Sequence, residues 1–249
     1  MEQCLYVQCF IALHQKRMNS LDLYGRKVNI FNSEADLLDY IADKKAILVA
    51  INAEKIANPN PQVKDIINAH IGYLDGIGPV LAARHKGHPN ACKIPGCELW
   101  LKIAERFRSS HSFYLLGSTK DVVQECVGRL KKDFPGINIV GFHDGFLTTE
   151  ALKKDVVNDI IACKPDIVFV AMGSPKQELF MAEMHSLYPA LYMGLGGSFD
   201  LYTGRIKRAP KWWVDHYMEF AYRFIEQPKR IKRLNNYFRF FWLMVTNKL

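Results

Sequence analysis

The stretch VFVAMGSPKQELF, residues 168–180, predicts a buried strand that turns directly into a helix. Strand-forming residues come first, Gly173 and Ser174 interrupt them, and a proline suits the first helical turn. Lys176 and Gln177 then place a positive charge and an amide where free backbone N–H groups favour an anion. Most junctions of this kind are only turns with a solvated helix start, so the stretch alone indicates function weakly.

The rest of the chain repeats this alternation of short apolar segments and amphipathic segments. Ser33 and Thr149 are placed to cap two of the amphipathic segments. Strands that alternate with helices form βαβ units, so the sequence predicts an α/β fold with a Rossmann-like, mainly parallel sheet flanked by helices. We expect strands at 28–31, 46–51, 112–117, 137–141, 166–173 and 190–197, and helices at 33–43, 61–69, 121–133, 149–163 and 175–186.

A second junction of interest reads GYLDGIGPVLAAR, residues 72–84. Asp75 follows a short apolar stretch there and precedes another helix. Ligands of parallel sheets bind outside the carboxyl ends of the strands, so Asp75 could bind a hydroxyl group or act as a base. An aspartate that only caps the helix is an equal alternative.

A third junction, MGLGGSFDLYTGR at residues 193–205, supplies Gly196 and Gly197, which allow close backbone approach to a ligand. It does not fit the dinucleotide fingerprint, because Phe199 stands where Gly or Ala is needed and the stretch follows the last expected strand. NAD binding is therefore disfavoured. The sequence also lacks a Walker motif, an Asp-x-Asp and further ligand spacing around His85 and His88, so we expect no metal and no cofactor.

The excess positive charge of the chain is confined to its C-terminal part. Residues 204–249 hold eleven Lys or Arg against three Asp or Glu, whereas residues 1–203 are neutral. The same segment holds three of the four tryptophans. We therefore expect an α/β domain at 1–203 and a basic, aromatic, helical appendage at 204–249.

The cellular location of the protein is indicated by features that its sequence lacks. No apolar run is long enough for a transmembrane helix, and the N-terminal segment has no basic start or small-residue cleavage site. The six cysteines form no CxxC pair. These features predict a cytoplasmic protein with reduced thiols.

The end of the appendage reads PKRIKRLNNYFRFFWLMVTNKL and places five apolar residues on one helical face: Ile231, Leu234, Phe238, Phe241 and Val245. Basic residues lie off this stripe. Such a helix suits the surface of an anionic membrane. One alternative is a helix packed on the body with a basic outer face. A nucleic-acid site is less favoured because no RNA-binding signature occurs elsewhere, and we expect no nucleic-acid partner.

Taken together, several blocks of the chain resemble the WecG/TagA/CpsF glycosyltransferases (glycosyltransferase family 26). The similar blocks occur in the same order over about residues 20 to 235, which makes the resemblance far more specific than any one motif. The segment before residue 21 has no recognised counterpart. The blocks are VAINAEK (49–55), YLDGIG (73–78), AMGSPKQE (171–178), GLGGSFD (194–200) and GRIKRAP (204–210).

Within the family, the residues of these blocks are most similar to those of members that make enterobacterial common antigen. The resemblance implies inverting transfer of N-acetyl-D-mannosaminuronic acid from its UDP-sugar to undecaprenyl-diphospho-N-acetylglucosamine. Other members transfer N-acetylmannosamine or glucose, which leaves the donor open. A non-catalytic protein of the same fold that binds a nucleotide-sugar or a polyanion is the alternative from another class.

The resemblance also assigns roles to individual residues. It implies that Asp75 is the general base and that Gln177 is a second catalytic residue. Asn52 matches the family's asparagine. Lys93 stands where other members have arginine, which keeps the charge but loses bidentate geometry. Ala50 stands where they have threonine, which removes a hydroxyl.

For the leaving diphosphate, the resemblance implies contacts without a metal. Backbone amides and cationic side chains would meet the developing charge. In the family the basic appendage is thought to close the active site at the membrane, which implies a cytoplasmic enzyme on the inner face of the membrane; a homo-oligomer stays open. The expected substrate-binding residues are Asn52, Lys93, Gly173, Ser174, Lys176, Gly196, Gly197, Arg223, Arg230 and Arg233.

Overall fold

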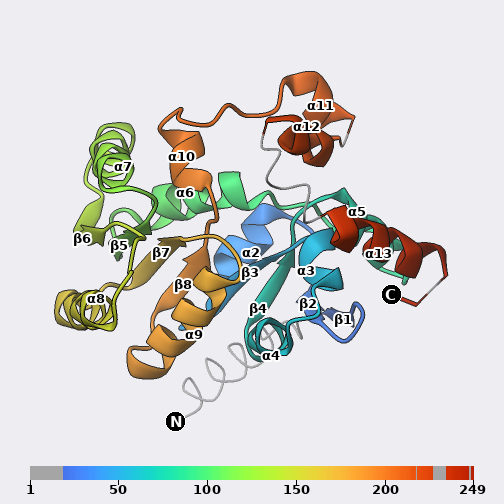
Figure 1. The fold of residues 1–249 in the computed structure, drawn as a ribbon, viewed down its shortest axis with the longest axis horizontal. Helices are drawn as coiled ribbons and strands as arrows, with labels where there is room; N and C mark the ends of the chain where they lie inside the picture. Colours follow the sequence, from blue (N-terminus) through green and yellow to red (C-terminus); the bar gives the residue numbers. More distant parts are fainter. Residues whose placement is uncertain (1–18, 217, 227–233, 247) are drawn as a thin grey trace, which may run out of the picture.

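Six parallel strands form the central sheet, in the order β4-β3-β8-β7-β5-β6 (Figure 1). The computed structural model describes residues 19–216, 218–226, 234–246 and 248–249. The strands are β3 (Ile47–Ile51), β4 (Ile71–Leu74), β5 (Ser112–Gly117), β6 (Asn138–His143), β7 (Ile167–Ala171) and β8 (Leu191–Gly194). The predicted α/β class with a parallel sheet is confirmed.

Helices cover both faces of this sheet, and a hydrophobic core lies on each side. Successive strand residues enter opposite cores: Val49 packs into one, and Leu48 and Ala50 pack into the other. Burial on both faces explains why the strands read as continuous apolar runs. One side carries α2 (Glu34–Ile41), α6 (Gly96–Phe107), α7 (Lys120–Asp133) and α10 (Ser198–Tyr202); the other carries α3 (Ala53–Ala57), α4 (Pro61–Ala69), α5 (Ile77–His85), α8 (Glu150–Cys163), α9 (Lys176–Leu187) and α13 (Leu234–Val245).

Most elements expected from the sequence are present, including the strand at 112–117 and the helix at 61–69. Both expected caps are confirmed: Ser33 Oγ accepts from the Asp36 N–H at 3.0 Å, and Thr149 Oγ1 accepts from the Leu152 N–H at 3.2 Å. Four cysteines in the described part are free thiols: Cys92, Cys97, Cys126 and Cys163.

The strand expected at 28–31 is wrong as a member of the parallel sheet. Residues Lys27–Asn29 form β2, which pairs antiparallel with β1 (Ser20–Asp22) in a separate two-stranded sheet. The hairpin forms because Tyr24 and Gly25 adopt positive φ angles, 56° and 72°, which reverse the chain.

Strand β4 was not predicted, because it has only four residues and contains Gly72. That glycine is needed for packing, since a Cβ there would lie 3.1 Å from both Ile51 Cγ1 and the Lys27 carbonyl oxygen. The strand pairs with β3 in parallel. It therefore delivers Asp75 to the same edge of the sheet as Asn52.

The position of β8 has the largest consequence for the site. It is the last strand in the chain, yet it lies between β3 and β7. The carboxyl ends of four neighbouring strands, β4, β3, β8 and β7, therefore place Asp75, Asn52, Gly196 and Gly173 along one edge. Strand order alone brings together blocks that are far apart in the sequence.

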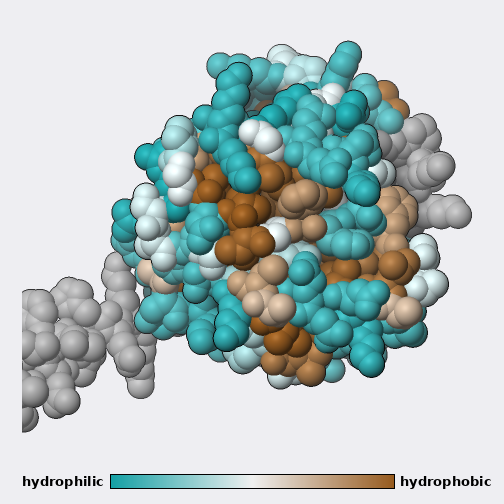
Figure 2. Space-filling view, turned by 90° about the vertical axis from the view of Figure 1, so that its left-hand side faces the viewer, coloured by the Kyte–Doolittle hydropathy of each residue, from teal (hydrophilic) through white to brown (hydrophobic). Residues whose placement is uncertain are grey.

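Figure 2 shows the side of the molecule formed by α7, α8 and β6, where apolar side chains interrupt a mostly hydrophilic surface. Exposed large apolar residues here include Phe142 on β6, Phe146 after it, and Leu152 and Ile161 on α8. Within the described residues β6 ends the sheet, so its outer edge is available for pairing. The sequence leaves a homo-oligomer open, and this edge is the first surface to test for one.

Candidate active site

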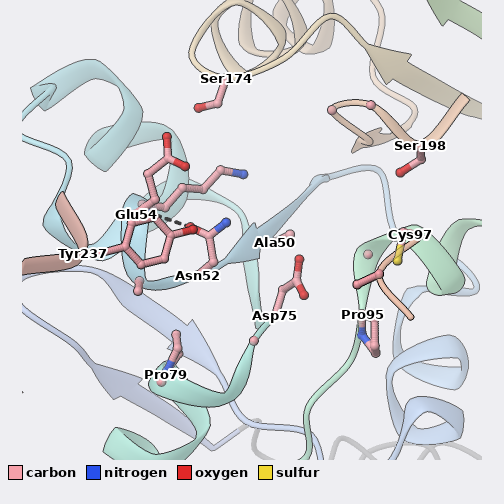
Figure 3. A pocket seen from close by; sticks show the side chains of 18 of the residues that line it. Ala50, Asn52, Glu54, Asp75, Pro79, Pro95, Cys97, Ser174, Ser198 and Tyr237 are labelled. Carbon is pink, nitrogen blue, oxygen red and sulfur yellow. Dashed lines mark hydrogen bonds between the residues drawn. The ribbon is translucent and has the colours of Figure 1, made fainter. Parts of the chain in front are cut away.

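A cavity of about 720 Å³ opens at the carboxyl ends of β4, β3, β8 and β7 (Figure 3). The loops after these strands line it, together with the segment 206–209, α12 (Glu219–Glu226) and α13. This is where ligands of parallel sheets bind. Polar lining residues are Asn52, Glu54, Lys55, Asp75, Lys93, Cys97, Ser174, Gln177, Ser198, Lys207, Arg208, Tyr222, Glu226 and Tyr237.

Asp75 directly follows β4, and its backbone N–H donates to the Ile51 carbonyl at 2.9 Å. Its side chain points into the cavity (Figure 3). Asp75 is not the N-cap residue that the alternative expected, because Gly76 holds the N-cap position of α5. Burial, and then the charge of Asp75, raise the pKa of the neighbouring Tyr73 phenol. Asp75 is thus placed to meet a ligand.

Gly96 provides the space beside this carboxylate. A Cβ on Gly96 would lie 2.9 Å from Tyr73 Oη and 3.6 Å from Asp75 Oδ2. Tyr73 is fully buried and has no room to move aside. Because residue 96 has no side chain, the space next to the Asp75 carboxylate stays open to a ligand.

We expect Gly96→Ala to lower activity about 10-fold or more, because a small displacement of a reacting group is costly. Overpacking should also reduce the free energy of unfolding by about 1–3 kcal/mol. The matched control is Gly128→Ala on α7, where a Cβ would meet nothing within 4 Å. Turnover and thermal unfolding of both variants test the expectation; equal turnover in the two would contradict it.

Gln177 joins the two glycine loops. Its Oε1 accepts from the Gly173 N–H at 3.1 Å and from the Gly196 N–H at 2.9 Å. Its Nε2 donates to Glu178 Oε1 at 3.1 Å. The side chain is buried and lies against Gly194, where a Cβ would approach Nε2 to 2.5 Å. Gln177 thus borders the cavity while its amide holds two of the loops that form it.

A buried ion pair lies directly behind this amide. Lys55 Nζ lies 2.9 Å from Glu178 Oε1, and the Glu178 side chain is fully buried. Burial alone would raise the pKa of Glu178, but the charge of Lys55 and hydrogen bonds outweigh burial and lower it. Lys55 itself lines the cavity. The pair therefore connects α3 and α9 beneath the site.

The remaining expected residues of the strand ends differ in placement. Asn52 lines the cavity and caps α3, with its Oδ1 accepting from the Lys55 N–H at 2.9 Å. Gly173, Ser174, Gly196 and Gly197 also line the cavity. Lys176 does not: it is exposed at the start of α9 and lies outside the lining. Its charge can act on a ligand only from a distance.

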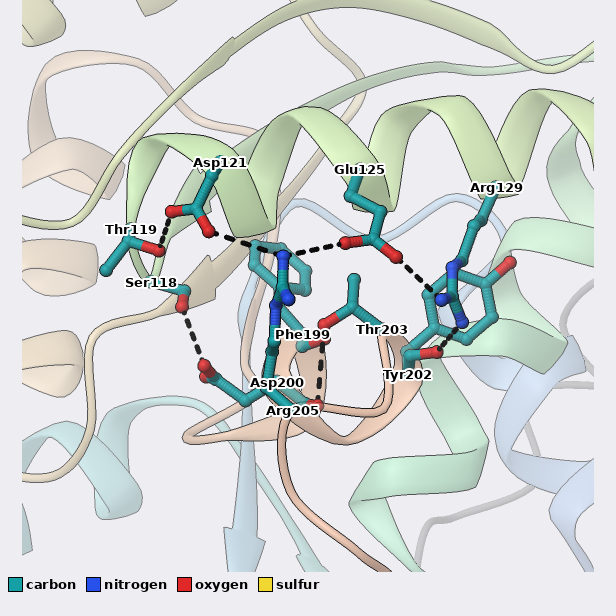
Figure 4. A network of polar contacts seen from close by, with 10 residues as sticks. All are labelled: Ser118, Thr119, Asp121, Glu125, Arg129, Phe199, Asp200, Tyr202, Thr203 and Arg205. Carbon is teal, nitrogen blue, oxygen red and sulfur yellow. Dashed lines mark hydrogen bonds and ion pairs between the residues drawn. The ribbon is translucent and has the colours of Figure 1, made fainter.

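The segment after α10 is fastened to the body by two arginines of the GRIKRAP block. Arg205 pairs with Asp121 at 3.4 Å and with Glu125 at 3.1 Å, both on α7 (Figure 4). Arg208 pairs with Glu98 on α6. These contacts hold residues 206–209 at the cavity. The block therefore positions a loop, a role that its sequence did not reveal.

Lys93 and Lys207 add positive charge to the lining. Lys93 precedes α6, and Lys207 lies on the fastened segment. The side chain of Lys93 is partly buried, whereas Lys207 is exposed. The expected cation at residue 93 is thus at the cavity.

Helix α13 packs on α3 and forms one side of the cavity with Tyr237, Phe238 and Phe241. Buried Phe240 and Leu243 hold it, and Phe240 lies so close to Gly78 that a Cβ there would meet its ring at 2.8 Å. The helix is therefore docked on the body by one face, as the packing alternative expects, but its exposed residues are mainly apolar and not basic.

Its other face carries part of the apolar stripe expected from the sequence. Phe238, Phe241 and Val245 are 65%, 60% and 63% exposed, and Trp242 is 66% exposed. Among the described residues no helix is both long and apolar enough to cross a bilayer. Three expected tail residues, Arg230, Arg233 and Ile231, lie outside the described residues. Only the backbone of Arg223 is described, within α12.

Several residues of the site were missed from the sequence, notably Lys55 and Cys97, which line the cavity, and Glu178, which pairs with Lys55 behind it. Lys55 and Glu178 were visible within VAINAEK and GSPKQE, where charged residues stand next to buried strands. The signal in the sequence was therefore the position of these two charged residues shortly after an apolar strand. Over the described residues, no group of three or more His, Cys, Asp or Glu is arranged to hold a metal ion.

Comparison with known proteins agrees with this geometry. Residues 21–249 match the Glycosyl transferase WecG/TagA/CpsF family. A relative from Bacillus spizizenii (strain ATCC 23059 / NRRL B-14472 / W23), N-acetylglucosaminyldiphosphoundecaprenol N-acetyl-beta-D-mannosaminyltransferase, is 33% identical over 227 residues, which cover 89% of this chain and 87% of the relative. A match over nearly the whole chain includes every strand of the central sheet and every residue placed at the cavity. The chain therefore belongs to the WecG/TagA/CpsF family of glycosyltransferases.

Proposed function

We propose that this glycosyltransferase moves N-acetyl-D-mannosaminuronic acid from its UDP-sugar to undecaprenyl-diphospho-N-acetylglucosamine with inversion, in the synthesis of enterobacterial common antigen. The observation that carries the transferase chemistry is the carboxylate of Asp75 in a cavity bounded by two glycine loops and by aromatic α13. The Bacillus relative is named for the same kind of acceptor and for N-acetylmannosamine as the sugar. UDP-N-acetylmannosamine is therefore an alternative donor, and UDP-glucose is a second one because other members of the family transfer glucose.

The mechanism follows from one base and one leaving group. Asp75 takes the proton of the acceptor hydroxyl as the hydroxyl oxygen bonds to the anomeric carbon. The bond from that carbon to the UDP oxygen breaks on the opposite side, which inverts the configuration. Lys207 and the backbone amides of the glycine loops, apart from those of Gly173 and Gly196 that are bonded to Gln177, meet the charge on the departing diphosphate. No metal is part of this proposal.

For the acceptor, we propose that the exposed side of α13 meets the membrane. Its aromatic residues and a cavity that opens beside them suit an acceptor whose lipid remains in the bilayer. The enzyme would then act at the inner face of the cytoplasmic membrane, with residues 204–249 as an appendage on a catalytic domain at 1–203. The proposed roles of Arg223, Arg230 and Arg233 at the leaving diphosphate belong to this appendage.

The test of the overall proposal is transfer of radiolabelled sugar from a panel of UDP-sugars to polyprenyl-diphospho-N-acetylglucosamine, with and without EDTA. Transfer from the uronic acid donor that survives EDTA supports the donor and the metal-free mechanism. Transfer from another sugar alone keeps the family and overturns the donor. UDP binding without any transfer favours a non-catalytic binding protein.

The donor proposal makes a specific prediction for Lys93, the partly buried cation at the cavity. A uronate would accept a charge-assisted hydrogen bond worth about 1.5–3 kcal/mol, so Lys93→Met should lower kcat/KM about 10- to 100-fold for that donor. Lys93→Arg should retain most of it. A neutral donor sugar should be affected less by Lys93→Met; an equal loss for both donors would place Lys93 at the diphosphate instead.

A further inference from the structure

A second cavity, of about 570 Å³, lies beside the β1–β2 hairpin, where the C-terminal end of the chain meets it. It shares no lining residue with the active-site cavity. The hairpin, the start of α4, the loop before it, α13 and the last two residues contribute to it. Its occupant is therefore a separate question from the sugar substrates.

The lining is strongly cationic. Four of its side chains are positively charged, and Asp22 is its acidic side chain. Asp22 Oδ1 accepts from the Gly25 N–H at 2.7 Å, which occupies it locally in the hairpin turn. None of the four cations has a carboxylate partner within 4.0 Å among the described residues. They are Arg26, Lys64, Arg239 and Lys248.

The lack of a counter-ion is energetically most unfavourable for Arg26, because this residue is buried. It is only 4% exposed and donates to two backbone carbonyls, those of Tyr24 at 2.9 Å and of Asn58. Its Nε is buried and has no hydrogen-bond partner in the described structure. Burial, and to a lesser extent the charge of Arg239, lower its pKa. Buried charges are normally paired, so this guanidinium indicates an anion supplied from outside.

Two of the other cations, Arg239 and Lys64, are held around the same point. Arg239 donates to Tyr24 Oη at 3.0 Å, and its guanidinium carbon lies 5.6 Å from the Tyr24 ring centroid. The guanidinium carbon of Arg26 lies 5.9 Å from that centroid, so one ring meets both arginines. Lys64 Nζ reaches Gly25 so closely that a Cβ there would lie 2.6 Å away. The cluster is thus built by specific contacts.

We propose that this cavity binds a phosphate group. A phosphate offers several acceptor oxygens to separate Arg and Lys donors, which fits a ring of cations better than a single carboxylate does. The group comes either from an anionic lipid headgroup or from free phosphate. The headgroup source is supported by α13, since Arg239 lies on it between the exposed residues Phe238 and Trp242.

The test uses Lys64→Gln/Arg239→Gln, which removes two cations of the site without touching buried Arg26. The matched control is Lys131→Gln/Lys132→Gln, two exposed lysines on α7, on the far side of the molecule (Figure 1). One arm measures binding to phosphatidylcholine vesicles with and without phosphatidylglycerol. The other measures the thermal shift caused by inorganic phosphate, with chloride at equal ionic strength as reference.

Each basic residue at an anionic surface contributes about 5-fold in affinity, so the site variant should bind phosphatidylglycerol vesicles about 30-fold more weakly than the control. It should also lose the thermal shift with phosphate. Loss of the phosphate shift with unchanged vesicle binding would support the site and identify free phosphate as its ligand. If the site and control variants behave alike in both arms, the proposal is overturned.

Discussion

Replacing Asp75 with asparagine should lower turnover by about 10²–10⁴-fold while UDP binding stays within a few-fold of wild type. Asparagine keeps the shape of the side chain and one acceptor oxygen but cannot take the proton of the acceptor hydroxyl. Asp75 extends from the end of β4 into the cavity, and the N-cap position of the following helix is held by Gly76. Single-turnover sugar transfer and titration with UDP measure the two quantities.

The control for this experiment is Asp65→Asn on α4, which removes one exposed carboxylate outside the cavity lining. It should leave both quantities unchanged. Near-normal turnover in Asp75→Asn would place the base elsewhere. A loss of UDP binding that accounts for the whole defect would make Asp75 a donor-binding residue. Full retention of ligand binding in a protein with no transfer activity in any variant would favour the binding-protein alternative.

The sequence predicted the strands and helices of the fold well where hydrophobic periodicity extends over a full element. It failed where the determining contact is distant. The segment 28–31 has strand-forming residues, but the hairpin turn at Tyr24 and Gly25 makes it pair with β1 and not with a strand of the main sheet. Strand β4 was missed because four residues carry too little pattern, although pairing with β3 stabilises it.

The candidate site, like the fold, was predictable only where the signal is local in the sequence. Asp75 and Gln177 stand out in sequence because polar residues directly follow apolar strands. The insertion of β8 between β3 and β7, which brings their loops together, depends on the whole topology and leaves no local signal. The partnership of Lys55 with Glu178 likewise joins residues more than a hundred positions apart. Nothing in either block identifies the other as its partner.

That ion pair leads to the second large effect. Glu178→Leu should reduce the free energy of unfolding by about 3–5 kcal/mol, because it leaves Lys55 buried without its counter-ion. The double variant Lys55→Met/Glu178→Leu should recover most of this stability, since apolar residues of similar volume replace a buried pair at little cost. Thermal and denaturant unfolding of the single and double variants measure the effect.

A pH series provides a further check on the pair. Lys55 and hydrogen bonds hold the pKa of Glu178 below its ordinary value, against the opposing effect of burial. The folded state therefore gains stability from the carboxylate above the unfolded pKa of about 4.3, and loses it as the pH falls through the lower folded value. The double variant should lack this part of the acid sensitivity. Identical acid profiles would show that the pair contributes nothing to stability.

Measurements of turnover distinguish a role of the Lys55–Glu178 pair in stability from a role in positioning the loops of the site. In wild type, Glu178 accepts from Gln177 Nε2, and this bond orients the amide whose oxygen holds the N–H groups of Gly173 and Gly196. Lys55→Met/Glu178→Gln keeps an acceptor for that amide, whereas Lys55→Met/Glu178→Leu removes it. If the network positions the loops, the Gln double variant should turn over about 10-fold faster than the Leu double variant at similar stability. Equal turnover with a raised KM for the UDP-sugar in both would instead mean that Lys55 contacts the donor itself.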